Sequence, residues 1–320
     1  MFVHSPFLAQ QQFLDNNTQY RGRFAPSPSG PLHFGSLVAA LGSYLQAKSN
    51  NGLWFVRIED IDKPREQDGA RERILEGLNA FGLNWDIDQN TAEPKHASYQ
   101  HCLVQSERIE RYQQVLDYLI EQNLVYACQC TRKQIKASGG IYQGTCSHKH
   151  LDFAHQAIRI HLSDATLAFQ DVHFGDVNSP ANFATEDFII KRRDQLFAYQ
   201  LVVVVDDIDQ GINQVVRGAD ILELTTRQLS LYKLFDVSPP SYLHLPLAVT
   251  KPGFKLSKQN HAVAINIKEP KTELLQALTF LGLPVEASPD LGSGTIEQIL
   301  QWAITHWNVS NLGRKTEIII

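Results

Sequence analysis

The chain has 320 residues, of which 43% are hydrophobic and 20% charged, a composition typical of a globular protein long enough for two domains. Its formal net charge of −5 argues against indiscriminate nucleic-acid binding, which needs a strong basic excess, but it leaves room for a local basic face. No apolar run approaches the length of a membrane span. Residues 1–19 lack the features of a signal peptide, so we expect a cytoplasmic protein with a loose N-terminal extension.

The first part of the chain alternates between strand and helix patterns. The elements expected up to residue 122 are, in chain order, a strand at 20–25, a helix from Leu37, a strand at 53–60, and helices at 64–82 and 106–122. Ser106 is the expected N-cap of the last of these helices.

The composition of the sequence changes between about Val125 and Pro180, where glycines, histidines and cysteines are frequent around short strand patterns such as 157–162. This region has the character of an insertion. Residues 187–207 return to a strand pattern, because their run LVVVV is apolar on both faces, as in a buried parallel strand. The remaining expected elements are a helix at about 220–235, a strand at 244–249, and helices at 271–282 and 295–307. The alternation of strands and helices predicts an α/β fold with a parallel sheet.

The stretch RGRFAPSPSGPLHFGS (21–36) connects the first strand to the first helix. Its prolines fix the backbone and its glycines allow close approach to a ligand, so it predicts a rigid loop before a helix N-terminus. Such a terminus presents free N–H groups and a partial positive charge, which favour a phosphate. His33 and Gly35 lie at this place, and Arg21 and Arg23 can add anion-binding forks. The alternative is a purely structural strand-to-helix turn.

A second loop, TKPGFKLSKQNHA (250–262), follows the last strand. It carries Lys251, Lys255 and Lys258, which would neutralise a triphosphate bound at the carboxyl end of that strand. Taken alone, this segment is better explained as a solvated basic loop, but the two loops together form a much more specific signal.

Three of the four cysteines cluster in ACQCTRKQIKASGGIYQGTCSHKH (127–150) with the spacing C-x-C-x15-C-x-H. This arrangement predicts a structural zinc site, which needs four tetrahedral ligands. General zinc chemistry points to His148 or His150 as the fourth ligand. The remaining cysteine, Cys102, is expected to be a packed thiol.

The motifs RFAPSPSGPLHFGS and KLSKQ resemble the two signatures of class I aminoacyl-tRNA synthetases in their glutamate-specific form. Three further blocks of the same group have counterparts in VRIEDID (56–62), FAYQ (197–200) and VVRGADILELTTRQ (215–228). The full form of the first signature has a second histidine after the glycine, but this chain has Ser36 at that position. Related glutamate enzymes also lack this histidine. The resemblance covers roughly residues 22–261.

Only sixty residues follow Asn260, fewer than the ~100 or more that a usual domain needs, so no anticodon-binding domain is expected. The chain therefore resembles most closely the truncated family of glutamyl-queuosine tRNA(Asp) synthetases, with which KLSKQNHA also agrees. The resemblance implies a monomeric enzyme that activates L-glutamate with ATP and Mg²⁺ and transfers it to the queuosine base of tRNA(Asp). No membrane partner is expected.

The same resemblance implies roles for individual residues. The glutamate pocket would be lined by Arg23, Phe24, Ala25, Pro26, Ser27, Glu59, Tyr199 and Arg217. In this pocket the two arginines suit carboxylates, Glu59 suits the ammonium group, and the tyrosine can donate its hydroxyl. The catalytic and ATP-binding residues would be His33, Gly35, Ser36, Lys255 and Lys258. Without the resemblance, Arg57 and Glu59 are explained as a surface pair.

For the zinc site, the resemblance implies Cys128, Cys130, Tyr142 and Cys146 as ligands, with His148 as runner-up to the tyrosine. It also implies a Rossmann-like, doubly wound catalytic domain at 20–100 and 185–250, a zinc-containing insertion at 101–184, and a signature loop with a helical region at 251–320.

Two other functions remain open at this stage. One is a truncated glutamyl-tRNA synthetase that charges tRNA(Glu), and the other is a non-catalytic binding protein with a synthetase-like fold. An acidic chain that grips an anticodon loop needs a local basic surface, to which Lys191, Arg192 and Arg193 are candidate contributors.

Overall fold

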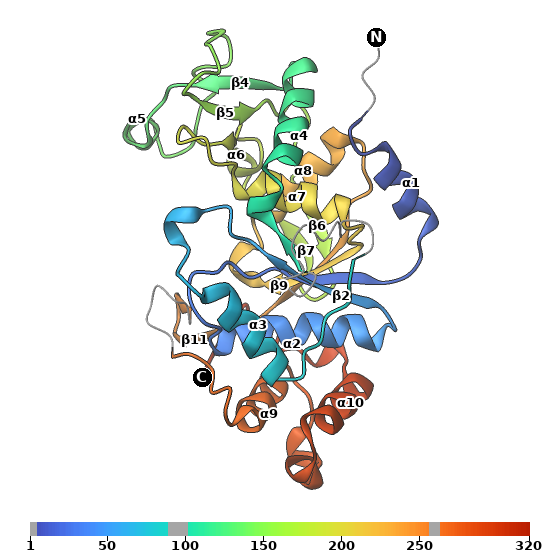
Figure 1. The fold of residues 1–320 in the computed structure, drawn as a ribbon. Coiled ribbons are helices and arrows are strands. Elements are labelled where there is room, and N and C mark those ends of the chain that lie inside the picture. Colours follow the sequence, from blue (N-terminus) through green and yellow to red (C-terminus); the bar gives the residue numbers. More distant parts are fainter. Residues whose placement is uncertain (1–4, 89–101, 256–262) are drawn as a thin grey trace.

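The computed structural model describes residues 5–88, 102–255 and 263–320 (Figure 1). The helices are α1 (Leu8–Asn16), α2 (Phe34–Ser49), α3 (Ala70–Ala80), α4 (Ile109–Glu121), α5 (Arg132–Ala137), α6 (Ala181–Ala184), α7 (Tyr199–Asp209), α8 (Thr225–Phe235), α9 (Pro270–Phe280) and α10 (Ile296–His306). The strands are β1 (Arg21–Phe24), β2 (Leu53–Ile58), β3 (Leu103–Val104), β4 (Val125–Cys128), β5 (Ala157–Ile160), β6 (Ala168–Asp171), β7 (Gly175–Asn178), β8 (Ile189–Lys191), β9 (Gln214–Gly218), β10 (Ser241–Leu245), β11 (Leu247–Lys251), β12 (Phe254–Lys255) and β13 (Glu317–Ile319).

Two parallel ladders form the centre of the fold. One has the order β1-β2-β3 and the other has the order β7-β6-β10-β9, in which only the β6–β7 pair is antiparallel. The two ladders meet where the N–H of Asn213, just before β9, bonds the carbonyl of Arg21 in β1 at 3.1 Å. Because the strands run parallel, their carboxyl ends lie along one edge, where α/β sheets bind their ligands. The expected α/β fold with a parallel sheet is confirmed.

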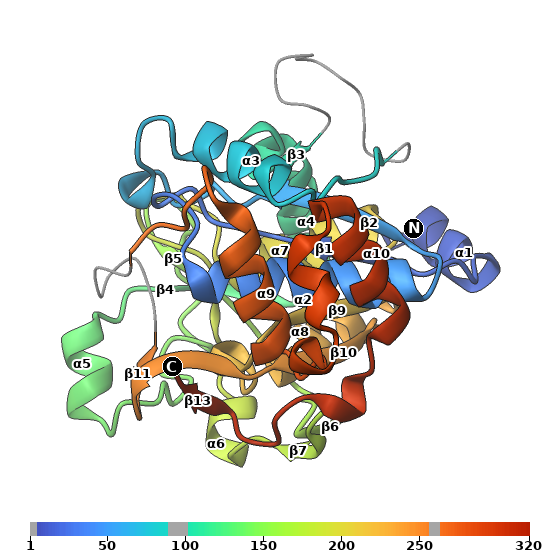
Figure 2. The ribbon, with the colours of Figure 1, turned by 90° about the horizontal axis from the view of Figure 1, so that it is seen from below.

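Helices cover both faces of this sheet. In Figure 1, α2 lies directly below the strands with α9 and α10 beneath it, whereas α7, α8 and α4 lie above. Figure 2, seen from below, shows α9 and α10 in front of α2 and the strands. Each face has its own buried core, one built mainly on α2 and the other on α7. Among the residues that the structure describes, no helix has both the length and the apolar character that crossing a membrane requires.

Helix α7 corrects one prediction. The run LVVVV, expected as a buried strand, lies in this helix, and every residue from Leu201 to Asp209 is buried. A helix that is surrounded by protein on all sides has no polar face, so its sequence shows no 3.6-residue period. The apolar run alone therefore could not distinguish a buried helix from a buried strand.

Two smaller expectations also differ from the structure. Ser106 does not cap α4, which begins at Ile109; its N–H and hydroxyl bond the carboxylate of Asp60 instead, at 2.8 and 2.6 Å. The N-terminal extension, expected to be loose, contains α1, and Phe7 before it is fully buried against Phe235 with ring centroids 4.9 Å apart.

A buried ion cluster fastens α7 to the sheet. Asp207 of α7 accepts two hydrogen bonds from Arg23 of β1, at 2.9 and 3.2 Å, and its carboxylate lies 2.7 Å from the guanidinium of Arg57 in β2. Burial alone would raise the pKa of Asp207, but Arg23 and Arg57 outweigh this effect and hold it below its usual range. The carboxylate is therefore ionised and holds both arginines in place.

Replacing Asp207 by asparagine should lower the free energy of unfolding by about 3–5 kcal/mol, because two buried arginines lose their shared counter-charge. The matched control is Asp194→Asn, which breaks the half-exposed pair with Arg192 (2.6 Å) and should cost less than about 1 kcal/mol. Urea denaturation of both variants checks this expectation, and equal small losses would contradict it.

Candidate active site

The connection from β1 to α2 forms a fixed loop at the carboxyl edge of the sheet. The carbonyl of Pro26 accepts the N–H of Glu59 at 3.0 Å, which joins the loop to the end of β2. His33 is the N-cap of α2, since its Nδ1 accepts the N–H of Ser36 at 3.3 Å. The loop thus leads into a helix N-terminus, as the sequence predicted.

A cavity of about 470 Å³ opens at this helix terminus. Its wall includes His33, Gly35 and Ser36, the three described residues that were expected to bind ATP. The ends of β9 and β10 close the other side of the cavity, through Gly218 and the segment 245–248. Lys258 lies outside the described residues, and so does the side chain of Lys255.

A smaller cavity of about 230 Å³ adjoins the first, because both are lined by Ser27, Ser29 and Arg65. Glu59 and Tyr199, expected in the glutamate pocket, line this second cavity. The two cavities therefore lie side by side, with Ser27 in the wall of both. Arg23 and Arg217, also expected in the glutamate pocket, are not among the residues that line either cavity.

Glu59 is a carboxyl held in an unusual state. Its exposed fraction is 8%, and its carboxylate lies 3.5 Å from the guanidinium of Arg57. Burial raises the pKa of Glu59 to about 7, and the nearby charges of Arg57 and Arg23 offset only part of this effect. Near pH 7 this carboxyl is therefore about half ionised, and a bound cation would increase its ionised fraction.

The hydroxyl of Tyr199 lies among the charged groups of the site. Burial raises its pKa, and the charges that act on it are those of Arg217, Glu59, Arg23 and Asp207. Tyr199 is the first residue of α7, so the buried helix brings this hydroxyl to the ends of β1, β2 and β9. Two arginines and two carboxyls are thus near enough to affect the titration of this single hydroxyl.

Arg23 and Arg217 are both nearly buried, with exposed fractions of 3% and 6%. Arg23 is held by Asp207, as described above. Arg217 donates to Gln228 Oε1 and Thr225 Oγ1, each at 2.8 Å, and to His244 Nε2 at 3.0 Å. Both guanidinium groups are therefore fixed by side chains of the protein before any ligand arrives.

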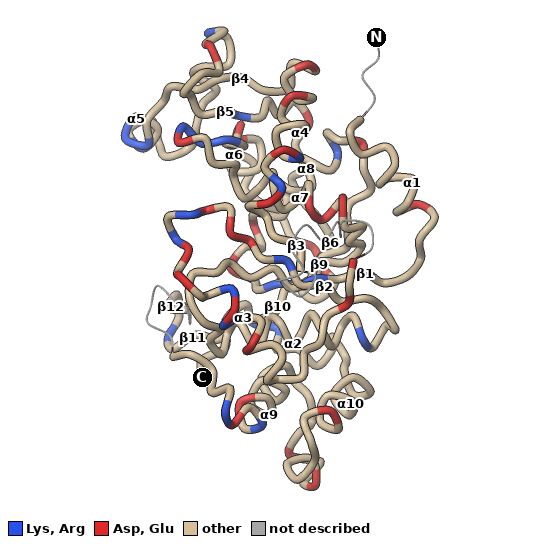
Figure 3. The backbone as a smooth tube through the Cα atoms, in the orientation of Figure 1, with Lys and Arg blue, Asp and Glu red and all other residues tan. Residues whose placement is uncertain are grey.

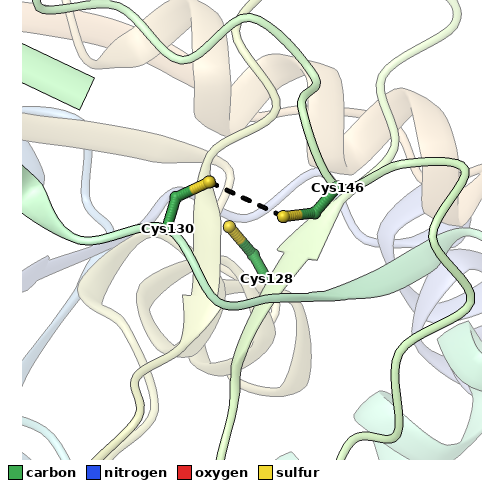
Figure 4. A group of neighbouring side chains, drawn as sticks. All are labelled: Cys128, Cys130 and Cys146. Atoms are coloured by element: carbon green, nitrogen blue, oxygen red, sulfur yellow. Dashed lines mark hydrogen bonds between the residues drawn. The ribbon is translucent and has the colours of Figure 1, made fainter. Parts of the chain in front are cut away.

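The cysteines come together as expected (Figure 4). The Sγ atoms of Cys128, Cys130 and Cys146 all lie within 4.8 Å of one another, and the last two are 3.6 Å apart. Ligands at Zn–S distances of about 2.3 Å in a tetrahedron would be roughly 3.8 Å apart, so this set fits a zinc ion.

Tyr142, the expected fourth ligand, lies beside the three thiols. This side chain is buried, and its hydroxyl accepts the N–H of Cys146 at 2.8 Å and also contacts the thiol of Cys128. His148 and His150 are exposed and do not belong to the cluster within the described residues. Burial raises the pKa of Tyr142, so ligation through its oxygen needs a cation to stabilise the phenolate.

Three side chains that organise the site were not singled out as site residues from the sequence: Asp207, His244 and Asp171. Asp207 ends an apolar run in the sequence, and an acidic residue at such a place is most often explained as a helix cap or a loop contact. His244 stands in the otherwise apolar stretch HLPLAV, and a polar residue there is the one signal that the sequence offered. Nothing in the sequence marks Asp171.

Comparisons with known proteins agree with this geometry. A family described as "tRNA synthetases class I (E and Q), catalytic domain" matches residues 19–295. A Vibrio parahaemolyticus protein named glutamyl-Q tRNA(Asp) synthetase is 51% identical over 300 residues, which cover 94% of this chain and 96% of the relative. An Escherichia coli protein of the same name is 49% identical over 305 residues, covering 95% and 94%.

Among solved structures, the chain resembles a glutamate tRNA ligase from Elizabethkingia meningosepticum in complex with its amino acid, with a TM-score of 0.72 and 23% identity. The match covers 93% of this chain and 66% of that one, and at this identity it shows a shared fold. The chain therefore belongs to the class I tRNA synthetases of the E and Q group, within the family whose members are named glutamyl-Q tRNA(Asp) synthetase.

Proposed function

We propose that this protein activates L-glutamate with ATP to form glutamyl-adenylate and then transfers the glutamate to the queuosine base in the anticodon loop of tRNA(Asp). The names of relatives that match nearly the whole chain support this reaction. The observation that carries it is the pair of fixed arginines with Glu59 around the Tyr199 hydroxyl, next to a cavity at the N-terminus of α2.

Glutamate carries two carboxylates and one ammonium group, and the charged side chains that act on the Tyr199 hydroxyl offer the complementary charges. Arg23 and Arg217 would bind the carboxylates, Glu59 the ammonium group, and the Tyr199 hydroxyl would donate a hydrogen bond. The segment Phe24–Ala25–Pro26–Ser27 would close the pocket with its backbone and with Ser27. Because the arginines are already fixed, little ordering free energy is lost on binding.

The larger cavity would hold ATP. The N-terminus of α2, with Gly35 and Ser36, would receive phosphates, and His33 with Lys255 and Lys258 of the basic loop would stabilise the charge that develops on them. The glutamate α-carboxylate attacks the α-phosphorus and pyrophosphate leaves; Mg²⁺ bound with ATP would neutralise part of the phosphate charge. The protein's share is positioning and charge stabilisation.

A tRNA needs a basic surface, and the insertion offers one. Arg132, Lys133 and Lys136 of α5 are exposed, and they form the blue segment at α5 in Figure 3. Arg192 lines the smaller cavity, and Arg193 is exposed beside it in sequence. We propose that these groups contact the phosphates of the anticodon arm.

The insertion at 101–184 would be held together by one structural zinc ion bound to Cys128, Cys130, Tyr142 and Cys146. The metal would cross-link the end of β4 to the loop that carries Tyr142 and Cys146. The catalytic domain would then comprise 20–100 and 185–250, together with β3, β6 and β7, which lie within 101–184 in the sequence but pair with its strands. Residues 251–320 would form the signature loop and helical region. We expect a monomer.

The acceptor is tested by incubating the protein with labelled glutamate and ATP in the presence of tRNA(Asp) with queuosine, tRNA(Asp) without it, or tRNA(Glu). Label on the queuosine-containing tRNA(Asp) alone is the expected result. Label on tRNA(Glu) would identify an ordinary glutamyl-tRNA synthetase. Absence of label and of glutamate-dependent pyrophosphate exchange would indicate a binding protein with a synthetase-like fold.

Glutamate binding should release protons at neutral pH. Glu59, with a pKa of about 7, is partly protonated in the free protein, and a bound ammonium group lowers that pKa, so roughly half a proton is released at pH 7. Affinity for glutamate should accordingly weaken as the pH falls below about 7. Calorimetry in two buffers of different ionisation enthalpy measures this release. At pH 9 the release should vanish, and a buffer-independent binding enthalpy at pH 7 would refute the role of Glu59.

Metal analysis should find about one zinc per chain. Cys146→Ser should abolish zinc binding and lower the melting temperature, whereas the matched variant Cys102→Ser should retain the metal. Tyr142→Phe should weaken zinc binding by roughly 10- to 100-fold, with His148→Ala unchanged. A folded, active protein without zinc, or equal effects at Tyr142 and His148, would speak against this ligand set.

A further inference from the structure

Arg217 is surrounded by acceptors that fix its orientation. It stands on β9, directly opposite His244 of β10 in the parallel register, so the two side chains point to the same face of the sheet. Three of the five N–H groups of an arginine are used by His244, Gln228 and Thr225. One N–H on each terminal nitrogen is left over from these three bonds.

The bond to Arg217 dictates the state of the imidazole. A guanidinium only donates hydrogen bonds, so Nε2 of His244 must be the acceptor and carries no proton. The ring proton is then on Nδ1, which lies 2.7 Å from Oδ2 of Asp171. Burial lowers the pKa of His244 to about 4, against the opposing hydrogen bond to Asp171, so the ring is neutral at physiological pH.

Asp171 holds this tautomer firmly because it is itself saturated with donors. Its Oδ1 accepts the N–H groups of His173 and Phe174, each at 2.9 Å, while Oδ2 also accepts the backbone N–H of His244 at 3.1 Å. If Asp171 were an asparagine, its amide NH₂ group would face N–H groups and would find no acceptor. Both Asp171 and His244 are almost completely buried.

We propose that Asp171 and His244 are positioning residues for substrate recognition: through a single imidazole tautomer they fix the guanidinium of Arg217 so that its two remaining N–H groups bind a carboxylate of the amino-acid substrate. This inference rests on the proposed function, in which Arg217 binds glutamate. Asp171 belongs to β6, which lies between β4 and β8 in the sequence. Through this residue, that part of the chain would contribute to the amino-acid subsite.

The test compares three variants in ATP–pyrophosphate exchange. His244→Phe removes the acceptor and should raise the KM for glutamate roughly 10- to 100-fold with little change in the KM for ATP, because a hydrogen bond to a charged group is lost at one substrate only. Asp171→Asn should act in the same direction. His244→Gln keeps an acceptor for Arg217 and should recover part of the loss.

The matched control is His173→Gln, in the same turn, whose ring contacts the carbonyl of Gly313 at 3.0 Å and not the site. It should leave both KM values unchanged. In an Arg217→Lys background, His244→Phe should add less than about a twofold effect, since the two residues would act as one unit. Independent, additive losses, or parallel losses for glutamate and ATP, would mean that the pair only supports the fold and would overturn the proposal.

A measurement on the unmodified protein covers the case in which the variants fail to fold. Nitrogen NMR of labelled histidine should find His244, identified by its contact with the stacked Tyr242 ring (6.1 Å between centroids), protonated at Nδ1 only at pH 7. Its Nε2 signal should shift when glutamate is added. A protonated Nε2, or no response to glutamate, overturns the inference. Failure of the proposed function has a different sign: the unmodified protein would show no glutamate-dependent pyrophosphate exchange. That result is distinct from the NMR result, which reports the tautomer of His244.

Discussion

The fold depends on one carboxylate that binds two arginines in the interior. Asp207 bonds Arg23 of β1 and Arg57 of β2, and Asp206 and Glu59 add negative charge beside Arg57. Since Asp207 belongs to α7, the cluster determines how this helix lies across the strand ends. It thereby also determines where Tyr199, the first residue of α7, presents its hydroxyl.

The same principle operates on both sides of the proposed amino-acid subsite. Arg23 is held by a charged acceptor, and Arg217 is held by three neutral acceptors on β10 and α8. A guanidinium that is fixed before binding loses little entropy when it meets a carboxylate, and it rejects ligands that cannot pair with it. Glu59 lies 3.5 Å from Arg57 and has a raised pKa. In the proposed function, the ammonium group of the substrate would add positive charge beside this buried carboxyl.

Prediction from sequence succeeded where the signal was local. The strand at 53–60, the loop from Phe24 to Ser36 and the cluster of three cysteines were each recognisable because turn chemistry, alternation or ligand spacing acts over a few neighbouring residues. Prediction failed at α7, where burial on every side removed the helical period, and at Ser106, whose hydroxyl bonds a carboxylate on a distant segment.

The sequence by itself determined the alternating architecture, the rigid loop before α2 and the grouping of the three cysteines, because each depends on residue type and short spacing. Only the tertiary structure decided which side chains hold them. The contact of Asp171 with His244 spans 73 positions, and that of Arg23 with Asp207 spans 184. Such pairs follow from strand order and helix placement, which arise from the packing of the whole chain and not from any local pattern.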